Sequence, residues 1–278
     1  MLKARVVTAV PLALMFIGLV LFASSNVLAL VFGLFVLMGA WEWTRLSGIE
    51  SLLLRSLFLV LIAAGLVAGS AQLQLLTQVQ RLNVQSVMGV ACLSWAVAML
   101  WVKGYPSSAI LWRSRIMRLI MGCLMLVPAW IAVMFLLSVP LGRIILICMV
   151  ATVVVADVGA YFAGRFLGRH KLAPKVSPGK TWEGFWGGFL ACMGFGVLMW
   201  WLRPVELSHL NLSAILAITL TTALASVVGD LMVSMVKRES GLKDSGNLLP
   251  GHGGVLDRLD SICGAAPIFT LGYMLANW

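Results

Sequence analysis

Long apolar segments recur along the whole chain, with short polar segments between them. Nine of these segments approach the roughly 20 apolar residues that a membrane-spanning helix needs. They cover residues 6–23, 27–43, 52–69, 84–102, 116–138, 144–162, 185–202, 212–236 and 262–276. The pattern therefore predicts an all-α integral membrane protein with about nine transmembrane helices.

Composition supports this interpretation. Hydrophobic residues make up 61% of the chain and charged residues 11%, whereas soluble domains average about 25% charged residues. The five cysteines lie in apolar segments without a CxxC pair, so we interpret them as small apolar helix residues rather than disulfide partners or metal ligands. The net charge of +10 suits anionic partners such as lipid headgroups or nucleotides.

The basic residues predict how the helices are oriented. With a cytosolic N-terminus, all of the 20 Lys and Arg residues except Arg81, Arg143 and Arg203 fall at or near cytosolic connections. Cytosolic loops of membrane proteins collect Lys and Arg. We therefore predict that the N-terminus is cytosolic and that the C-terminus lies outside.

Acidic residues are distributed differently, because seven of the ten lie in the last half of the chain at or near the predicted cytosolic face. The exceptions are Glu42 and Glu50, which we place at an early cytosolic loop, and Glu206 on the outer side. We therefore divide the chain into N-terminal scaffold spans at 1–140 and catalytic spans at 141–278. The catalytic part has two cytosolic loops, at 164–184 and 237–261. The first of these, 164–184, is called the basic loop below.

Residues 234–260, called the signature segment below, bring many ionisable groups between two apolar segments. Asp230, Ser234 and Lys237 have i, i+4, i+7 spacing and share one helix face. A helix that starts at Leu212 places Asp230 roughly 27 Å along its axis, near the inner boundary of the hydrocarbon. Capping of the last helix could explain one of the acidic residues that begin it.

Helix capping does not explain why carboxylates from two different helices approach the same basic residues. Asp230 and Asp257 lie on either side of Lys237, Arg238 and Lys243 in the sequence. Mg²⁺ is commonly bound through one or two carboxylates together with substrate phosphates, and basic side chains would hold those phosphates. We therefore predict a magnesium site at Asp230 and Asp257.

The basic loop contains Gly179, Lys180 and Thr181, which are typical of a phosphate-binding P-loop. The P-loop pattern fails because Pro174 stands where its first glycine belongs, and we expect no strand before it. Two interpretations of the loop remain, a phosphate-binding segment and an anchor for anionic lipids. Asp157, in the predicted span before this loop, should point into the bundle, either toward a cation or in a hydrogen bond between helices.

The signature segment resembles a known family at nearly every fixed position. Its order is Ser234, Lys237-Arg238, Lys243-Asp244, Pro250-Gly251-His252-Gly253-Gly254, Asp257-Arg258 and Asp260. This is similar to the signature of the phosphatidate cytidylyltransferases, also called CDP-diglyceride synthetases. Residues 177–184, Ser-Pro-Gly-Lys-Thr-Trp-Glu-Gly, resemble a second segment of that family.

The resemblance implies a reaction in which phosphatidate attacks the α-phosphorus of CTP, with Mg²⁺ as cofactor. It implies Asp230 and Asp257 as metal ligands, and catalytic roles for these two with Lys237, Arg238, Lys243 and Asp244. Substrate-binding residues would be Ser177, Lys180, Thr181, Ser234, His252, Arg258 and Asp260. A homodimer in the inner membrane of a bacterium, without a nucleic-acid partner, is also expected, and a second, monovalent cation stays an open alternative.

Three other functions deserve comparison. A CTP-dependent polyprenol kinase on a related scaffold would use the same kinds of residue. A transporter would use Asp157 and Asp230 as coupling groups, but the ionisable residues cluster at one face and no inverted repeat is visible. A purely structural membrane protein would not need so many acidic residues at one end.

Overall fold

Long helices make up most of the part of the chain that the computed structural model describes, residues 14–73, 80–246 and 253–276. Within these residues, eight helices are long and apolar enough to cross a membrane. They are α2 (Ser25–Leu46), α3 (Leu52–Leu73), α4 (Arg81–Gly104), α6 (Arg115–Ser138), α7 (Gly142–Leu167), α8 (Trp182–Leu202), α9 (Leu212–Glu239) and α10 (Leu256–Ala276). Short helices, α5 (Ala109–Trp112) and the 3₁₀ turn η1 (Val205–Leu207), lie in connections.

The helices confirm the predicted all-α membrane architecture. Each of the last eight predicted spans corresponds to one of these helices, with ends that differ by several residues. The first predicted span, 6–23, lies partly outside the described residues, and its described end is helical at 14–22. The side of the membrane that each terminus faces stays a prediction.

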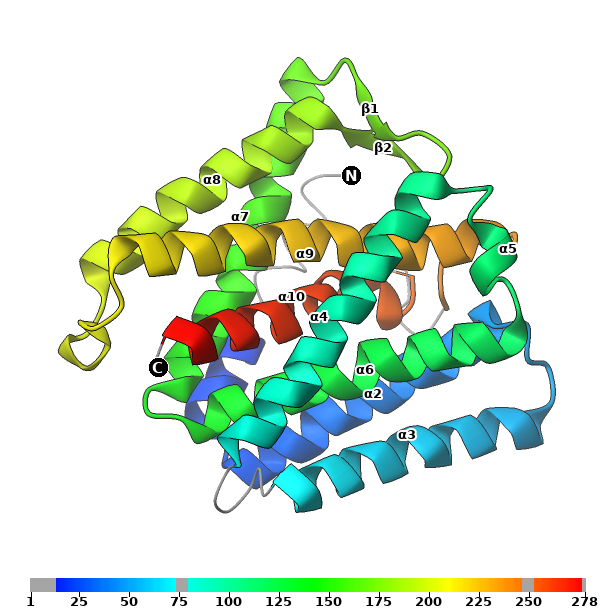
Figure 1. Ribbon diagram of the computed structural model, residues 1–278, viewed down its shortest axis with the longest axis horizontal. Coiled ribbons are helices and arrows are strands. Elements are labelled where there is room, and N and C mark those ends of the chain that lie inside the picture. The colour runs from blue at the N-terminus through cyan, green and yellow to red at the C-terminus, as the bar shows by residue number, and fades with distance from the viewer. Residues whose placement is uncertain (1–13, 74–79, 247–252, 277–278) are drawn as a thin grey trace.

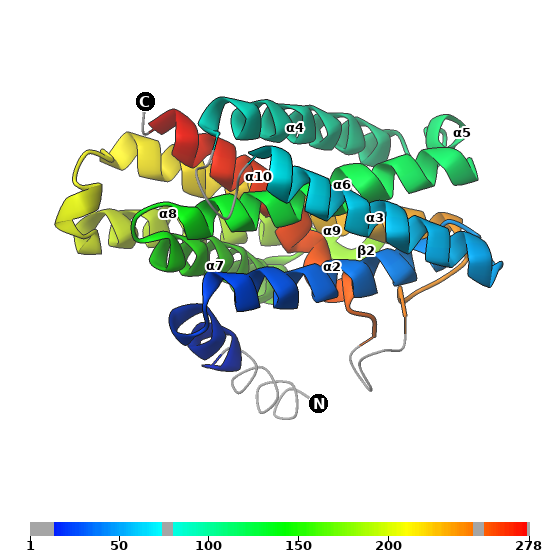
Figure 2. The same ribbon diagram turned by 90° about the horizontal axis from the view of Figure 1, so that it is seen from below.

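Helices α6, α9 and α10 form the centre of the bundle. About 72% of the most apolar part of α6 and 61% of that of α10 are buried, compared with 17% for α3 and for α8. Figure 2 shows α2 on one face and α4 on the opposite face, with α10 between them, and α10 contacts α2, α4, α6, α7 and α9. The helix that carries Asp257 in its first turn is therefore held on several sides.

Glycines allow α9 and α10 to approach closely beside the candidate site. A side chain at Gly229 would overlap the backbone carbonyl of Asp260, and one at Gly264 would overlap the carbonyl of Ala225. Backbone cannot move aside as a flexible side chain can. These two glycines therefore set the distance between the helices that carry Asp230 and Asp260.

We expect Gly229→Ala to destabilise the protein by about 1–3 kcal/mol, because the added methyl group must push α9 away from α10. Thermal unfolding in detergent should show the loss as a lower Tm. Gly194→Ala in α8 is the matched control, since nothing lies within 4 Å of a Cβ there and alanine favours helix. Equal Tm values for the two variants would contradict the close-packing account.

Four connections that we predict to be cytosolic meet at one end of the bundle. Arg118 Nη1 donates to the Leu46 carbonyl at 2.7 Å and to Ser240 Oγ at 2.9 Å. The Tyr105 hydroxyl lies 3.3 Å from Glu239 Oε2, and Arg238 Nε donates to the Val176 carbonyl at 3.2 Å. The ends of α2, α4, α7 and α9 therefore share one end of the molecule, as the predicted topology requires.

A small antiparallel hairpin joins α7 to α8. Its strands are β1 (Lys171–Ala173) and β2 (Ser177–Thr181), with Lys171 opposite Thr181. The expectation that no strand precedes Gly179-Lys180-Thr181 was therefore wrong. The P-loop stays excluded by its glycine spacing, because Pro174 still occupies the first glycine position.

Candidate active site

The face of α9 predicted from its spacing is present in the structure. Ser234 Oγ donates to Asp230 Oδ1 at 3.1 Å, one turn apart on the helix. The next residue on this face, Lys237, is buried, and its Nζ lies 2.7 Å from Oδ1 of Asp257 on α10. The signature segment thus folds back so that its last helix meets the end of α9.

Asp257 ties several parts of the signature segment together. Its Oδ1 contacts Lys237, while its Oδ2 accepts hydrogen bonds from the backbone N–H groups of Ser245 and Gly254, each at 3.0 Å. Gly253 has a φ of 82°, which glycine adopts without strain. The carboxylate therefore joins α9, the loop on both sides of residues 247–252, and the start of α10.

The basic loop reaches the same site from the other side. Lys180 Nζ of β2 forms a 2.6 Å ion pair with Asp230 Oδ2. Arg238 Nε donates a hydrogen bond to the carbonyl of Val176 in the hairpin turn. Thr181 is buried and caps α8, since its hydroxyl accepts from the Gly184 N–H at 3.1 Å. Two segments far apart in the sequence therefore form one cationic and acidic cluster.

Charges in this cluster lie close enough to influence one another. Lys237 interacts electrostatically with Asp230, Asp257 and Asp260, and Lys180 interacts with Asp157 as well as Asp230. The Lys237 and Asp257 side chains are only 10% and 11% exposed. Because a charge buried to that extent is costly without its partner, these residues form one interdependent set.

The other predicted site residues lie around this cluster with different exposure. Lys243, Asp244 and Arg258 are exposed, Ser177 is half-buried, and Asp260 is buried with its Oδ1 accepting from the Ser261 N–H. His252 lies outside the described residues. Glu183, which is not among the predicted site residues, contacts a ring nitrogen of His170 at 2.6 Å and closes the base of the hairpin. Catalytic and substrate-binding roles for the whole set stay predictions.

One buried acidic residue of this region was missed from the sequence. Glu42 is 3% exposed and lies near the end of α2, in the predicted span 27–43 and close to the early loop, but its burial was not predicted. Its carboxylate accepts from Ser245 Oγ at 2.8 Å, from the Val255 N–H at 3.0 Å and from the Leu256 N–H at 2.8 Å. A lone carboxylate near the end of an otherwise apolar segment was the signal that could have identified it.

Comparisons of the sequence with known proteins match the chain to one family. The model of the cytidylyltransferase family matches residues 3–276. The chain belongs to this family. A phosphatidate cytidylyltransferase of Pseudomonas aeruginosa is 41% identical over 278 residues, which cover 100% of this chain and 99% of that protein.

Other relatives of the cytidylyltransferase family give the same result. The phosphatidate cytidylyltransferase of Haemophilus influenzae is 35% identical, covering 98% of this chain and 99% of its own length. That of Staphylococcus epidermidis is 44% identical over 115 residues, which is 41% of this chain and 43% of that protein. The similarity therefore extends over nearly the full length in two relatives and over a shorter segment in the third.

Two carboxylates of the cluster could serve as oxygen ligands for a magnesium ion that also binds substrate phosphates. The described residues contain no group of three or more His, Cys, Asp or Glu side chains placed to hold a metal ion. Asp230 and Asp257 each offer a carboxylate already held by a lysine. This donor set fits Mg²⁺ that arrives with substrate phosphates and needs one or two protein carboxylates.

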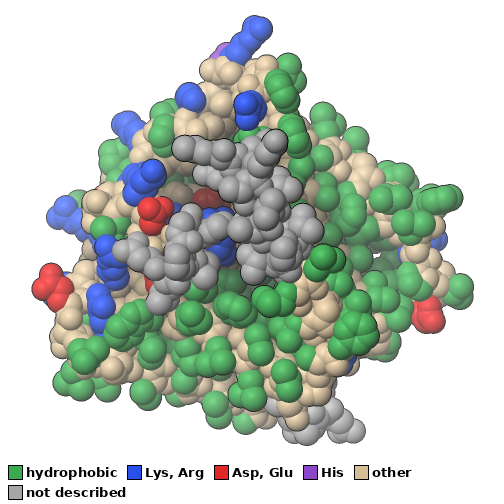
Figure 3. Space-filling view, turned by 180° about the vertical axis from the view of Figure 1, so that it is seen from behind, with side chains coloured by type: hydrophobic (Ala, Val, Ile, Leu, Met, Phe, Trp, Pro, Cys, Tyr) green, Lys and Arg blue, Asp and Glu red, His purple; other side chains and the backbone are tan. Residues whose placement is uncertain are grey.

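The surface separates charged from apolar regions. In Figure 3, Lys, Arg, Asp and Glu side chains gather mainly on one side, whereas hydrophobic side chains cover much of the remaining face. A cytidylyltransferase that acts on a membrane lipid needs both kinds of surface, one for the bilayer and one for a polar ligand. The charged cluster lies at the end of the bundle where the connections meet.

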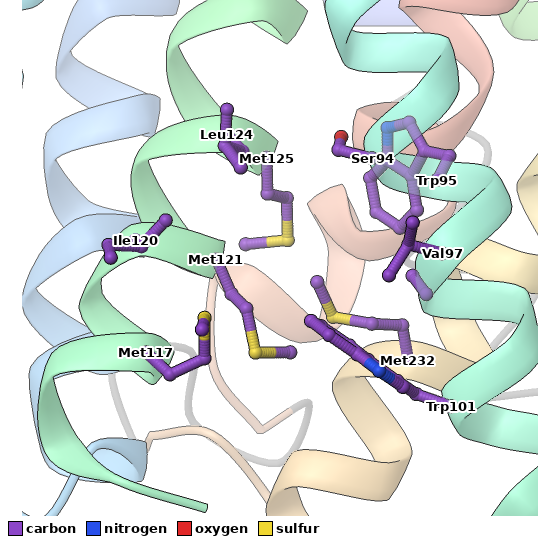
Figure 4. A pocket seen from close by; sticks show the side chains of 11 residues that line it. Ser94, Trp95, Val97, Trp101, Met117, Ile120, Met121, Leu124, Met125 and Met232 are labelled. Carbon is purple, nitrogen blue, oxygen red and sulfur yellow. The ribbon is translucent and has the colours of Figure 1, made fainter. Parts of the chain in front are cut away.

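A cavity elsewhere in the bundle is not suited to phosphate. It has a volume of about 170 Å³ and lies between α4 and α6, with Met232 of α9 at its edge. Apart from Ser94, the side chains that Figure 4 shows around it are apolar or aromatic. Met232 lies two residues beyond Asp230, so it leaves α9 on a different face from the charged cluster.

Lys180→Ala should slow cytidylyl transfer about 30-fold to 100-fold, because it removes the ammonium group that contacts Asp230 and would contact a phosphate. Steady-state rates with CTP varied at saturating lipid would measure the loss. Lys175→Ala is the control, since Lys175 is exposed at the tip of the same hairpin. Equal losses in both variants would indicate a general effect of loop charge rather than a role of Lys180.

Proposed function

We propose that this protein transfers the cytidylyl group of CTP to phosphatidate, giving CDP-diacylglycerol and pyrophosphate for phospholipid synthesis. The bond formed joins a phosphate oxygen of phosphatidate to the α-phosphorus of CTP. The bond broken is the α–β phosphoanhydride, whose electron pair leaves with pyrophosphate. The full-length similarity to phosphatidate cytidylyltransferases supports this reaction.

One structural observation carries the proposal. Two buried or half-buried lysine–carboxylate pairs, Lys180 with Asp230 and Lys237 with Asp257, lie toward the C-terminal end of α9, and Lys237 also interacts electrostatically with Asp230. On the predicted topology, this end of α9 lies at the level of the lipid phosphates of the inner leaflet, where a nucleotide can approach from water. A site at the boundary therefore brings together substrates that arrive from two phases.

The protein's own residues would contribute positioning and charge rather than covalent chemistry. In nucleotidyl transfer, as in phosphoryl transfer, the main requirements are alignment of the attacking and leaving oxygens and neutralisation of phosphate charge. The ammonium groups of Lys180 and Lys237 would exchange part of their contact with carboxylates for contact with phosphate oxygens. Arg238, exposed at the end of α9, would add positive charge where pyrophosphate leaves.

Mg²⁺ completes the proposal as the cofactor. We infer that Asp230 and Asp257 hold it, and that it would neutralise charge on the phosphates of CTP when bound. Ser234 would keep Asp230 oriented through its hydrogen bond. We also propose that the protein works as a homodimer in the inner membrane of a bacterium, on the basis of the family resemblance.

Labelled CTP separates this function from its nearest rival. Purified protein would be given phosphatidate or a polyprenol, together with CTP labelled at either the α- or the γ-phosphorus. We expect lipid-soluble label only from α-labelled CTP and only with phosphatidate. Label from γ-labelled CTP in the polyprenol would identify a kinase instead. Transport of solute in proteoliposomes without CTP consumption would favour a transporter.

A further inference from the structure

We propose that Glu42, in the N-terminal half of the chain, is a positioning residue for cytidylyl transfer. Its carboxylate would hold the loop after α9 and the start of α10 so that Asp257 stays against Lys237. This inference rests on the proposed function, and it assigns to α2 a role in the active site beyond scaffolding.

Glu42 uses both carboxylate oxygens to hold the signature segment. Oε1 accepts from the Val255 N–H, and Oε2 accepts from the Leu256 N–H and from Ser245 Oγ. The first N–H groups of a helix have no partner within the helix, and a negative charge near them is favourable. A buried carboxylate from α2 therefore supplies the acceptors that the start of α10 needs.

The same two stretches of chain also contact Asp257. Ser245 donates its hydroxyl to Glu42 and its backbone N–H to Asp257. Gly254, whose N–H donates to Asp257, directly precedes Val255, whose N–H donates to Glu42. The two carboxylates thus hold the chain together on both sides of residues 247–252. A shift of either stretch would change the position of the Asp257 carboxylate relative to Lys237.

Two glycines of the signature segment give Glu42 the space it occupies. A Cβ at Gly246 would overlap the Glu42 side chain, and a Cβ at Gly254 would overlap both Glu42 and Ser245 Oγ. Backbone at these positions can lie against the carboxylate only because no side chain intervenes. The Glu42 carboxylate therefore occupies a space that exists because residues 246 and 254 have no side chain.

A positioning role and a simple anchoring role for Glu42 predict different experimental results. An anchor would affect how much protein folds, while each folded molecule would keep its normal rate and magnesium requirement. A positioning residue would alter turnover by folded enzyme, because Asp257 would lose its fixed geometry. Loss of a group that orients a metal ligand typically costs 10-fold to 100-fold in affinity or activity.

The test compares Glu42→Gln and Ser245→Ala with Glu50→Gln as control, because Glu50 is an exposed acid just beyond the same helix. For Glu42→Gln we expect kcat per folded molecule to fall about 10-fold to 100-fold and half-maximal activity to need more Mg²⁺. Ser245→Ala, which removes one of the three bonds, should show a smaller loss. The double variant should be little worse than Glu42→Gln, since both changes disrupt the same contact.

Hydrogen exchange of a peptide that includes Val255 and Leu256 gives a readout that does not depend on the reaction. Faster exchange in Glu42→Gln, together with the kinetic losses, would support the proposal. Normal kcat and magnesium dependence in folded Glu42→Gln would overturn it, as would additive losses in the double variant. If Glu42→Gln does not fold, Ser245→Ala decides by the same criteria.

If the wild-type protein itself transfers no cytidylyl group, the proposed function has failed. Unchanged hydrogen exchange in Glu42→Gln would then reject the positioning role separately.

Discussion

Asp257→Asn should give a folded, membrane-inserted protein that transfers cytidylyl groups about 1,000-fold more slowly than the wild type. Asparagine keeps an oxygen that can accept from the Ser245 and Gly254 N–H groups. It removes the negative charge that balances Lys237, whose side chain is only 10% exposed. It also removes an oxygen ligand of the proposed metal site.

The measurement is the rate of α-labelled CTP incorporation into lipid, with thermal unfolding of the same sample as the check on folding. Removing one partner of a buried ion pair is expected to lower the free energy of unfolding by about 3–5 kcal/mol. The assay temperature should therefore stay well below the Tm of the variant. Activity near that of the wild type would remove Asp257 from the catalytic set.

Asp230→Asn should slow the reaction about 100-fold to 1,000-fold, and higher Mg²⁺ should restore little of the rate. Asp230 connects α9 to the basic loop through its ion pair with Lys180, and it accepts a hydrogen bond from Ser234 on the same helix. Without the charge, Lys180 loses its partner and the proposed metal loses one of two ligands. The change therefore affects both the nucleotide and the metal.

Turnover at a series of CTP and Mg²⁺ concentrations would measure the effect of Asp230→Asn. Glu206→Gln serves as the control because Glu206 lies in the connection between α8 and α9, at the other end of α9 from Lys237. A wild-type dependence on Mg²⁺ in Asp230→Asn, with only a modest loss of rate, would assign the metal to other residues.

Apolar length and helix spacing were enough to predict the fold and one face of the site. The last eight spans follow from composition because a bilayer imposes a simple length requirement. The grouping of Asp230, Ser234 and Lys237 follows from helix periodicity alone. These features depend on residues close in sequence, which is why they could be predicted without a structure.

Contacts between distant segments could not be derived in the same way. Periodicity gives no means of pairing Lys180 with Asp230, because the pair depends on how the hairpin folds toward α9. Similarly, the role of Glu42, at the end of the predicted span 27–43, depends on its contacts with the signature segment more than 200 residues away. The short hairpin was missed because residues 171–181 contain Gly and Pro and lack the alternation that predicts strands.

Metal binding in the presence of nucleotide tests the central claim most directly. Mn²⁺ can replace Mg²⁺ as a probe, and its binding to the purified protein can be followed by electron paramagnetic resonance with and without CTP. We predict that CTP strengthens Mn²⁺ binding to the wild type and that Asp230→Asn and Asp257→Asn each abolish this strengthening. Wild-type binding in both variants would show that the carboxylates of α9 and α10 do not hold the ion.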